Sequence, residues 1–130
     1  MKAIVLLIIL SGIHSNNFEK TNANSKEKTE LHFDNKTIDF GVINNDTIIK
    51  VKYNYKNITD STIIITNYSA SCFCTDIIIS KDTLLAGESG YVELLLDTTH
   101  KNGAIKIYGI IESTTYEKFT KLILKGFIQR

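Results

Sequence analysis

The stretch "TIIKVKYNYKN", from Thr47 to Asn57, alternates between apolar and polar side chains. In an extended strand, successive side chains point to opposite faces of the sheet. The alternation therefore predicts a strand with one face in the core and one face in water. The predicted inner residues are Ile49, Val51, Tyr53 and Tyr55, and the predicted outer residues are Lys50, Lys52, Asn54 and Lys56.

Further extended runs share this character, and turn-forming residues separate them. The runs are "TIDFGVI", "STIIITNY", "DIIIS", "GYVELLLD", "AIKIYGIIES" and "FTKLILKGFI", and the breakers include "INND", "NITDS", "AGESG" and "THKNG". No segment shows a helical stripe, and turns recur about every 8–12 residues, which is typical of a sandwich or barrel. We predict an all-β, immunoglobulin-like β-sandwich of about seven antiparallel strands over residues 33–130. The antibody type is excluded because tryptophan is absent and the two cysteines are too close to join opposite sheets.

The N-terminus has the layout of a secretory signal. Lys2 is followed by an apolar run from Ala3 to Leu10 and then by small and polar residues. The run is too short to cross a bilayer, which takes about 20 apolar residues. We predict a signal peptide over residues 1–15, a flexible polar spacer over 16–32, and export to the periplasm or the extracellular space, with no stable membrane span after cleavage of the leader. Ile13 stands where a lipobox would have cysteine, so no lipid anchor is expected.

Composition argues against two classes of function. The net charge of +1 gives no basic face for a nucleic-acid partner. The sequence has no nucleophile elbow, phosphate-binding glycine loop or His-Glu-x-x-His helix, so we predict a protein that is not an enzyme and has no cofactor. Its aspartates fall mostly at strand ends and turns, where Asp bends the backbone; these include Asp39, Asp46, Asp60 and Asp97.

Cys72 and Cys74, in "YSASCFCTDI", are the only cysteines of the chain. In an exported protein they are expected to oxidise. Their Cα atoms would lie about 6.5–7 Å apart in an extended strand, so a disulfide needs a bent loop. Such a strained disulfide would be easily reduced, which keeps a redox role open. Against that role, no cationic partner is evident beside the loop to lower a thiol pKa.

Metal binding and simple packing are the other interpretations of this pair. Two thiolates could hold Cu(I) or half of a zinc site. Of the three histidines, His14, His32 and His100, only His100 lies in a turn that could approach the cysteines. We favour a structural pair that fills or staples the corner of a sheet, with Phe73 pointing into apolar surroundings.

The landmarks "FDNKTIDFGVINND", "CFCTD", "LLAGESGYVELLLD" and "LILKGFI" occur in an order that resembles the bacterial family called domain of unknown function 1573. The resemblance covers Phe33 to Ile128 and implies an exported immunoglobulin-like interaction domain with no established activity. Two positions depart from the family pattern: Phe73 replaces a glycine, and Ala86 replaces a proline. The residues that match the family motif are Phe40, Gly41, Asn57, Cys72, Cys74, Thr75, Gly87, Glu88, Gly90 and Gly126.

Two hypotheses for function follow. The first is a non-catalytic, exported module that binds an unidentified protein partner in the cell envelope through a strand edge or the cysteine loop. Some of the tyrosines are expected to contribute to that binding surface, although more than half are expected to pack in the core. The tyrosines considered are Tyr53, Tyr55, Tyr68, Tyr91 and Tyr108. The alternative is a small thiol-redox or Cu(I)-handling protein that uses the Cys72-Phe73-Cys74 loop.

Overall fold

A computed structural model describes residues 30–44 and 46–130, so the predicted leader and most of the spacer lie outside the described residues. The described part contains nine strands and no helix long and apolar enough to cross a membrane. The strands are β1 (Leu31–Phe33), β2 (Thr37–Asn44), β3 (Ile48–Asn57), β4 (Ile63–Ala70), β5 (Thr75–Ile79), β6 (Thr83–Leu84), β7 (Ser89–Asp97), β8 (Gly103–Ser113) and β9 (Phe119–Gln129).

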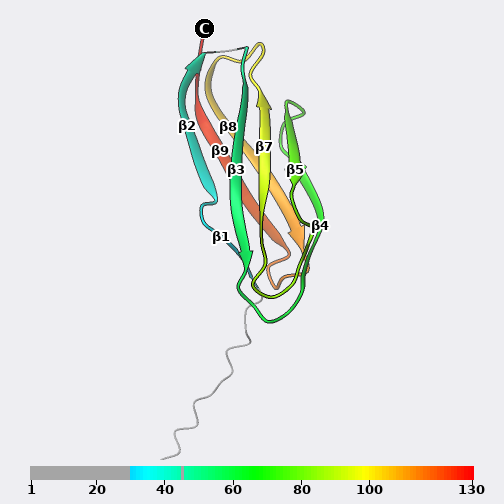
Figure 1. Ribbon diagram of the computed structural model, residues 1–130. Helices are drawn as coiled ribbons and strands as arrows, with labels where there is room; N and C mark the ends of the chain where they lie inside the picture. The colour runs from blue at the N-terminus through cyan, green and yellow to red at the C-terminus, as the bar shows by residue number, and fades with distance from the viewer. Residues whose placement is uncertain (1–29, 45) are drawn as a thin grey trace, which may run out of the picture.

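The strands form two packed sheets, one of order β1-β3-β7-β5 and one of order β2-β9-β8-β4-β6 (Figure 1). The predicted all-β, immunoglobulin-like sandwich is confirmed. It differs from the prediction in detail because β1 and β6 have only three and two residues, too few to show alternation. In addition, β2 pairs with β9 in parallel, whereas every strand was expected to be antiparallel.

Within the described residues, the folded domain includes two residues before the predicted boundary at residue 33. Strand β1 starts at Leu31, whose side chain is only 3% exposed and belongs to the core. The sequence did not reveal this strand, because Leu31, His32 and Phe33 alternate only once and the run before them is polar.

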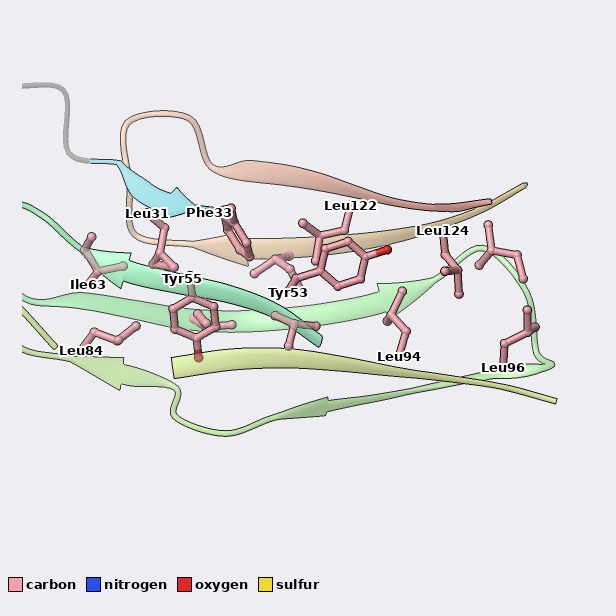
Figure 2. Packing of buried hydrophobic residues seen from close by; sticks show 14 residues of the cluster. Leu31, Phe33, Tyr53, Tyr55, Ile63, Leu84, Leu94, Leu96, Leu122 and Leu124 are labelled. Atoms are coloured by element: carbon pink, nitrogen blue, oxygen red, sulfur yellow. The ribbon is translucent and has the colours of Figure 1, made fainter. Parts of the chain in front are cut away.

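The core lies between the two sheets, where leucine and isoleucine side chains surround Tyr53 and Tyr55 (Figure 2). Both tyrosines are almost fully buried, and both bury a hydroxyl group. Tyr53 Oη donates to the Ile123 carbonyl at 2.7 Å, and Tyr55 Oη donates to the Lys81 carbonyl at 2.5 Å. Burial raises the pKa of Tyr53 well above its usual range, so its hydroxyl stays a donor.

The other three tyrosines named above lie outside the core, so the expectation that most would be core residues is wrong. Tyr68 is 48% exposed. The Lys52 ammonium lies 4.3 Å from the centroid of the Tyr91 ring, and the Lys121 ammonium lies 4.7 Å from the centroid of the Tyr108 ring. These contacts occur on the outer faces of the sheets, where the aliphatic stem of lysine covers the ring.

The four edge strands differ in how well they resist pairing with another chain. β1 and β6 are too short to act as templates. β2 is interrupted by a bulge between Asp39 and Val42, where Gly41 has φ of 76°. β5 is a regular five-residue strand of sequence "TDIII", which is neither very short nor interrupted by a bulge.

Candidate functional site

Residues 71–74 carry the chain from β4 in one sheet to β5 in the other, at one end of the sandwich (Figure 1). Cys72 and Cys74 form a disulfide, and their Cα atoms are 5.1 Å apart. The separation is shorter than in an extended strand because the loop bends: the Thr75 amide donates to the Cys72 carbonyl at 3.1 Å. Both cysteines are half-buried and pack against the core.

Phe73 lies at the tip of this loop, and its side chain is fully exposed, with a relative accessibility of 111%. The expectation that it points into apolar surroundings is wrong. The bend directs both sulfur atoms toward the protein, so the intervening side chain points away from it. Phe73 does not have a positive φ, so the loop forms without the glycine that is usual in the family.

The environment of the disulfide is asymmetric. The Cys74 amide N–H donates to Cys72 Sγ at 3.1 Å, and Lys101 Nζ lies 3.9 Å from the same sulfur. Cys74 Sγ has a neutral neighbour instead, the Thr75 hydroxyl at 3.6 Å. The expectation that no cation lies beside the loop is therefore wrong; Lys101 comes from a turn 29 residues away in sequence.

The turn after β7 holds Lys101 in place. Asp97 accepts a hydrogen bond from the Thr99 amide at 2.9 Å, and the Lys101 amide donates to the Thr98 carbonyl at 3.0 Å. His100 has φ of 63°, a left-handed conformation that turns the chain. It is thus Lys101, and not the suspected ligand His100, whose contact with Cys72 the structure records. Among residues 30–44 and 46–130, no three His, Cys, Asp or Glu side chains gather as a metal site.

Beside the loop, the β5 edge offers unpaired backbone groups. Within the described chain β5 pairs only with β7, through bonds such as Asp97 N–H to the Cys74 carbonyl at 2.9 Å and Ser80 N–H to the Tyr91 carbonyl at 3.0 Å. Since bonding alternates along an antiparallel strand, the N–H and C=O groups of Ile77 and Ile79 point to the open side. Ile78, between them, is 46% exposed on the outer face of the sheet.

A shallow cavity of about 220 Å³ adjoins the loop and this strand. It combines apolar side chains with two carboxylates, and Ile48 at its rim is 58% exposed. Its lining residues are Ile48, Phe73, Cys74, Asp76, Leu95 and Asp97. The loop, the cavity and the β5 edge thus form one continuous surface.

Other residues of the family motif lie at the opposite end of the sandwich and have structural roles. Asn57 is fully buried, and its Nδ2 donates to the carbonyls of Ser61 at 2.7 Å and Leu84 at 3.0 Å. Its Oδ1 accepts from the Thr59 amide at 3.0 Å and the Thr59 hydroxyl at 2.7 Å. One side chain thereby fixes the turn after β3 and ties it to β6.

The turn before β7 is closed by Gly87 and Glu88. Gly87 has φ of 79°, and its amide donates to the Asn57 carbonyl at 2.8 Å. The Glu88 carboxylate accepts from the Leu85 amide at 2.8 Å and pairs with Lys81 Nζ at 2.9 Å. The bond from Lys81, followed by that from Leu85, holds the pKa of Glu88 below its ordinary value of 4.5.

We expect this carboxylate to make stability depend on pH. Because its pKa is lower in the folded state, Glu88 stabilises the fold above pH 4.5, and the contribution is lost as pH falls through the lowered value. Glu88→Gln should therefore reduce the loss of unfolding free energy below pH 4.5, measured by urea denaturation at several pH values. Asp97, whose pKa the Thr99 hydrogen bonds also lower, keeps part of the dependence in that variant. An unchanged pH dependence in Glu88→Gln would contradict the assignment.

The remaining motif glycines make room for aromatic rings. A Cβ atom on Gly126 would lie 2.3 Å from the Phe40 ring, so Phe40 fills the space that this glycine leaves at the β2 bulge. A Cβ atom on Gly90 would lie 2.7 Å from Tyr55 Oη. The motif is thus divided: Cys72, Cys74 and Thr75 lie in the loop, and the other members stabilise distant parts of the fold.

The aspartates singled out by the sequence do not gather at one place. Asp39 accepts a hydrogen bond from the Gly41 amide at 2.8 Å, as Asp97 does from Thr99. Asp46 has φ of 61° in the turn before β3, and Asp60 lies in the turn after it. The two hydrogen bonds are of the kind by which Asp shapes turns.

Comparison with known proteins places this fold among related domains. A family model described as "Protein of unknown function (DUF1573)" matches residues 31–128. No curated protein matches the chain in sequence.

Among solved structures, a protein of unknown function from Porphyromonas gingivalis W83 is similar, with a TM-score of 0.66 and 9% identity over 76% of this chain and 46% of that chain. The PapD-like domain 7 of human CEP192 has a TM-score of 0.57 and 11% identity, over 79% of this chain and 87% of that domain. The secreted serine protease VesC from Vibrio cholerae has a TM-score of 0.61 and 18% identity, over 77% of this chain and 23% of the protease. The chain thus spans less than half the length of the first and the last of these proteins, and the likeness is one of fold alone.

Proposed function

The chain belongs to the DUF1573 family, and from that premise we propose that it is an exported, non-catalytic module that binds an extended segment of a cell-envelope protein along the β5 edge. In this mode of recognition the partner segment becomes an additional strand of the sheet. The observation that carries the proposal is the open, regular edge of β5 beside the exposed Phe73.

The backbone of β5 supports strand addition. Ile77 and Ile79 each present one N–H and one C=O group to the open side, and such unpaired groups attract a partner strand. Strands β1, β2 and β6 are short or bulged, so they compete poorly for the same segment. The part of β3 that β1 leaves unpaired carries the exposed Lys50 and Lys52, and charged side chains on an edge oppose pairing.

The side chains beside this edge support an apolar contact as well. Ile78 and Phe73 are both exposed, and each lies next to the cavity or the edge. Alternate side chains of an added strand would meet this surface, while the backbone bonds would give affinity with little sequence preference. Export is supported by the disulfide, because such bonds persist in oxidising compartments.

A photo-crosslinking residue at position 78 tests this proposal in cells. We expect it to capture one partner, whereas the same residue at position 64 should not. Ile64 is a matched control because it is 42% exposed against 46% for Ile78, but it lies on β4 where β6 covers the edge. A synthetic segment of the captured partner would then be used for binding.

Ile78→Lys should weaken binding of that segment tenfold or more, about 1.4 kcal/mol, while Ile64→Lys should leave it unchanged. Hydrogen exchange gives the sharper result: binding should slow exchange of the Ile77 and Ile79 amides, which are open in the free protein. Protection of β2 amides instead would contradict the proposal. So would a concentration-dependent dimer that pairs β5 with β5, because a second copy would then be the occupant.

A further inference from the structure

We infer that Cys72 and Cys74 form a thiol–disulfide exchange site in which Cys72 is released as the thiolate and Lys101 stabilises it. The inference goes beyond the binding function proposed above and does not depend on it. It rests on the difference between the surroundings of the two sulfur atoms.

Cys72 Sγ is surrounded by groups that favour negative charge. It accepts the Cys74 amide N–H at 3.1 Å, and the Lys101 ammonium lies 3.9 Å away. An adjacent cation and a hydrogen bond to the charged form both lower the pKa of a thiol. Cys74 Sγ has only the neutral Thr75 hydroxyl recorded as a polar partner, at 3.6 Å. Of the two sulfur atoms, Cys72 Sγ is therefore the one at which a negative charge has the lower free energy.

The site is accessible to a large partner. Both cysteines are half-buried in a loop whose tip is the fully exposed Phe73. Residue 75 begins the open β5 edge, so a segment lying along that edge would pass beside the disulfide. An apolar, exposed ring next to the sulfur atoms suits the docking of an unfolded or extended polypeptide.

The exchange step follows from this asymmetry. A thiolate of a partner dithiol attacks Cys74 Sγ, the Cys72–Cys74 bond breaks, and its electron pair leaves on Cys72 Sγ, where Lys101 stabilises the charge. The attack on Cys74 is preferred because the thiol of lower pKa is the better leaving group. The second partner thiolate then attacks the partner sulfur of the mixed disulfide and releases Cys74. Two partner thiols are thereby oxidised to a disulfide, and the loop disulfide is reduced. Of the two protons that the partner thiols lose, one goes to Cys74, and the other goes to solvent while Cys72 remains a thiolate.

A cation that stabilises the reduced form makes the disulfide a stronger oxidant. Equilibration of the protein with mixtures of reduced and oxidised dithiothreitol measures this effect directly. We expect Lys101→Met to shift the equilibrium about tenfold toward the disulfide, or about 30 mV. Lys101→Arg should keep most of the wild-type value because it keeps the charge.

Lys56→Met is the matched control. It also removes one positive charge, but Lys56 lies on β3, eight residues from Ile48 and near the opposite end of the sandwich. We expect its equilibrium to equal that of the wild type. If Lys101→Met also equals the wild type, Lys101 does not act on the sulfur and the inference fails.

Two single-cysteine variants identify the thiolate. Cys74→Ser leaves Cys72 alone, and Cys72→Ser leaves Cys74 alone. With iodoacetamide, Cys72 should react about tenfold faster at pH 7 and reach half of its maximal rate at lower pH, as expected for a thiol beside a cation. Adding Lys101→Met should remove this difference, and circular dichroism of each variant would check its fold. Equal pH profiles for the two cysteines would overturn the assignment.

The oxidised protein should also oxidise a synthetic peptide that contains two reduced cysteines, one disulfide formed per disulfide consumed. A loop disulfide that stays intact in its presence would overturn the inference. Ile78→Lys separates the two proposals, because it should weaken strand binding without changing the thiol equilibrium. Each proposal can therefore fail while the other stands.

Discussion

We expect Asn57→Ala to lower the free energy of unfolding by about 3–5 kcal/mol, which is a large part of the stability of a small domain. The Asn57 side chain is fully buried and takes part in four hydrogen bonds, two donated and two accepted. Alanine leaves the Ser61 and Leu84 carbonyls and the Thr59 donors without these partners. Each buried group left in this way costs about 1–3 kcal/mol, and the costs are not fully additive. Urea denaturation followed by circular dichroism measures the change.

Two further variants make this result specific. Asn67→Ala is the control, because Asn67 is exposed on β4 and accepts one hydrogen bond, from the Tyr68 amide at 2.9 Å. It should change stability by less than about 0.5 kcal/mol. Asn57→Asp keeps the shape but sets an oxygen against the Ser61 and Leu84 carbonyls, so it should be at least as harmful as alanine. A mild effect of both Asn57 variants would show that the turn finds other hydrogen bonds.

Gly90→Ala should destabilise the domain by about 2–3 kcal/mol through overpacking. The added methyl group would lie 2.7 Å from Tyr55 Oη and 2.8 Å from two carbon atoms of the ring. Tyr55 cannot move away cheaply, since it is only 2% exposed and its hydroxyl is bonded to the Lys81 carbonyl at 2.5 Å. Thermal or urea unfolding measures the loss.

Gly109→Ala is the matched control for this substitution. Like Gly90, Gly109 lies in a central strand, and it is buried, but a methyl group there would lie 3.5 Å from Leu94 Cδ2, an ordinary contact. It should be neutral within about 1 kcal/mol, since alanine also restricts the unfolded chain. Combining Gly90→Ala with Tyr55→Phe should cost less than the sum of the two changes, because the hydroxyl group takes part in the clash. Additive costs would place the strain elsewhere.

The sequence was sufficient for the fold because burial imposes a period of two. Tyr53 and Tyr55 alternate with Lys52 and Asn54, and this alternation predicted both the strand and its inner face. It failed for Leu31, which is buried in a strand of three residues, and for the parallel pairing of β2 with β9. Strand direction depends on where the chain crosses between sheets, and local pattern does not record that.

The candidate site was only half predictable, because it is assembled from distant segments. The cysteine pair was visible in the sequence, but the sequence left its structural, redox and metal-binding interpretations open. The contact of Lys101 with Cys72 was not, since nothing in a turn 29 residues later marks it as a neighbour. The open edge of β5 was also hidden, because only the pairing of all nine described strands shows which of them lie at the edges of the sheets.

The bulged β2, lying alongside β9, gives the sandwich two unlike flanks. A fibre grows only when each subunit offers adhesive surfaces at both flanks, so that every addition recreates a site for the next one. In this domain the bulge at Gly41 interrupts β2, so β2 offers no regular edge to which a further subunit could add. In the binding mode proposed above, one domain would therefore take up one strand, and a chain of such domains would not be expected to grow.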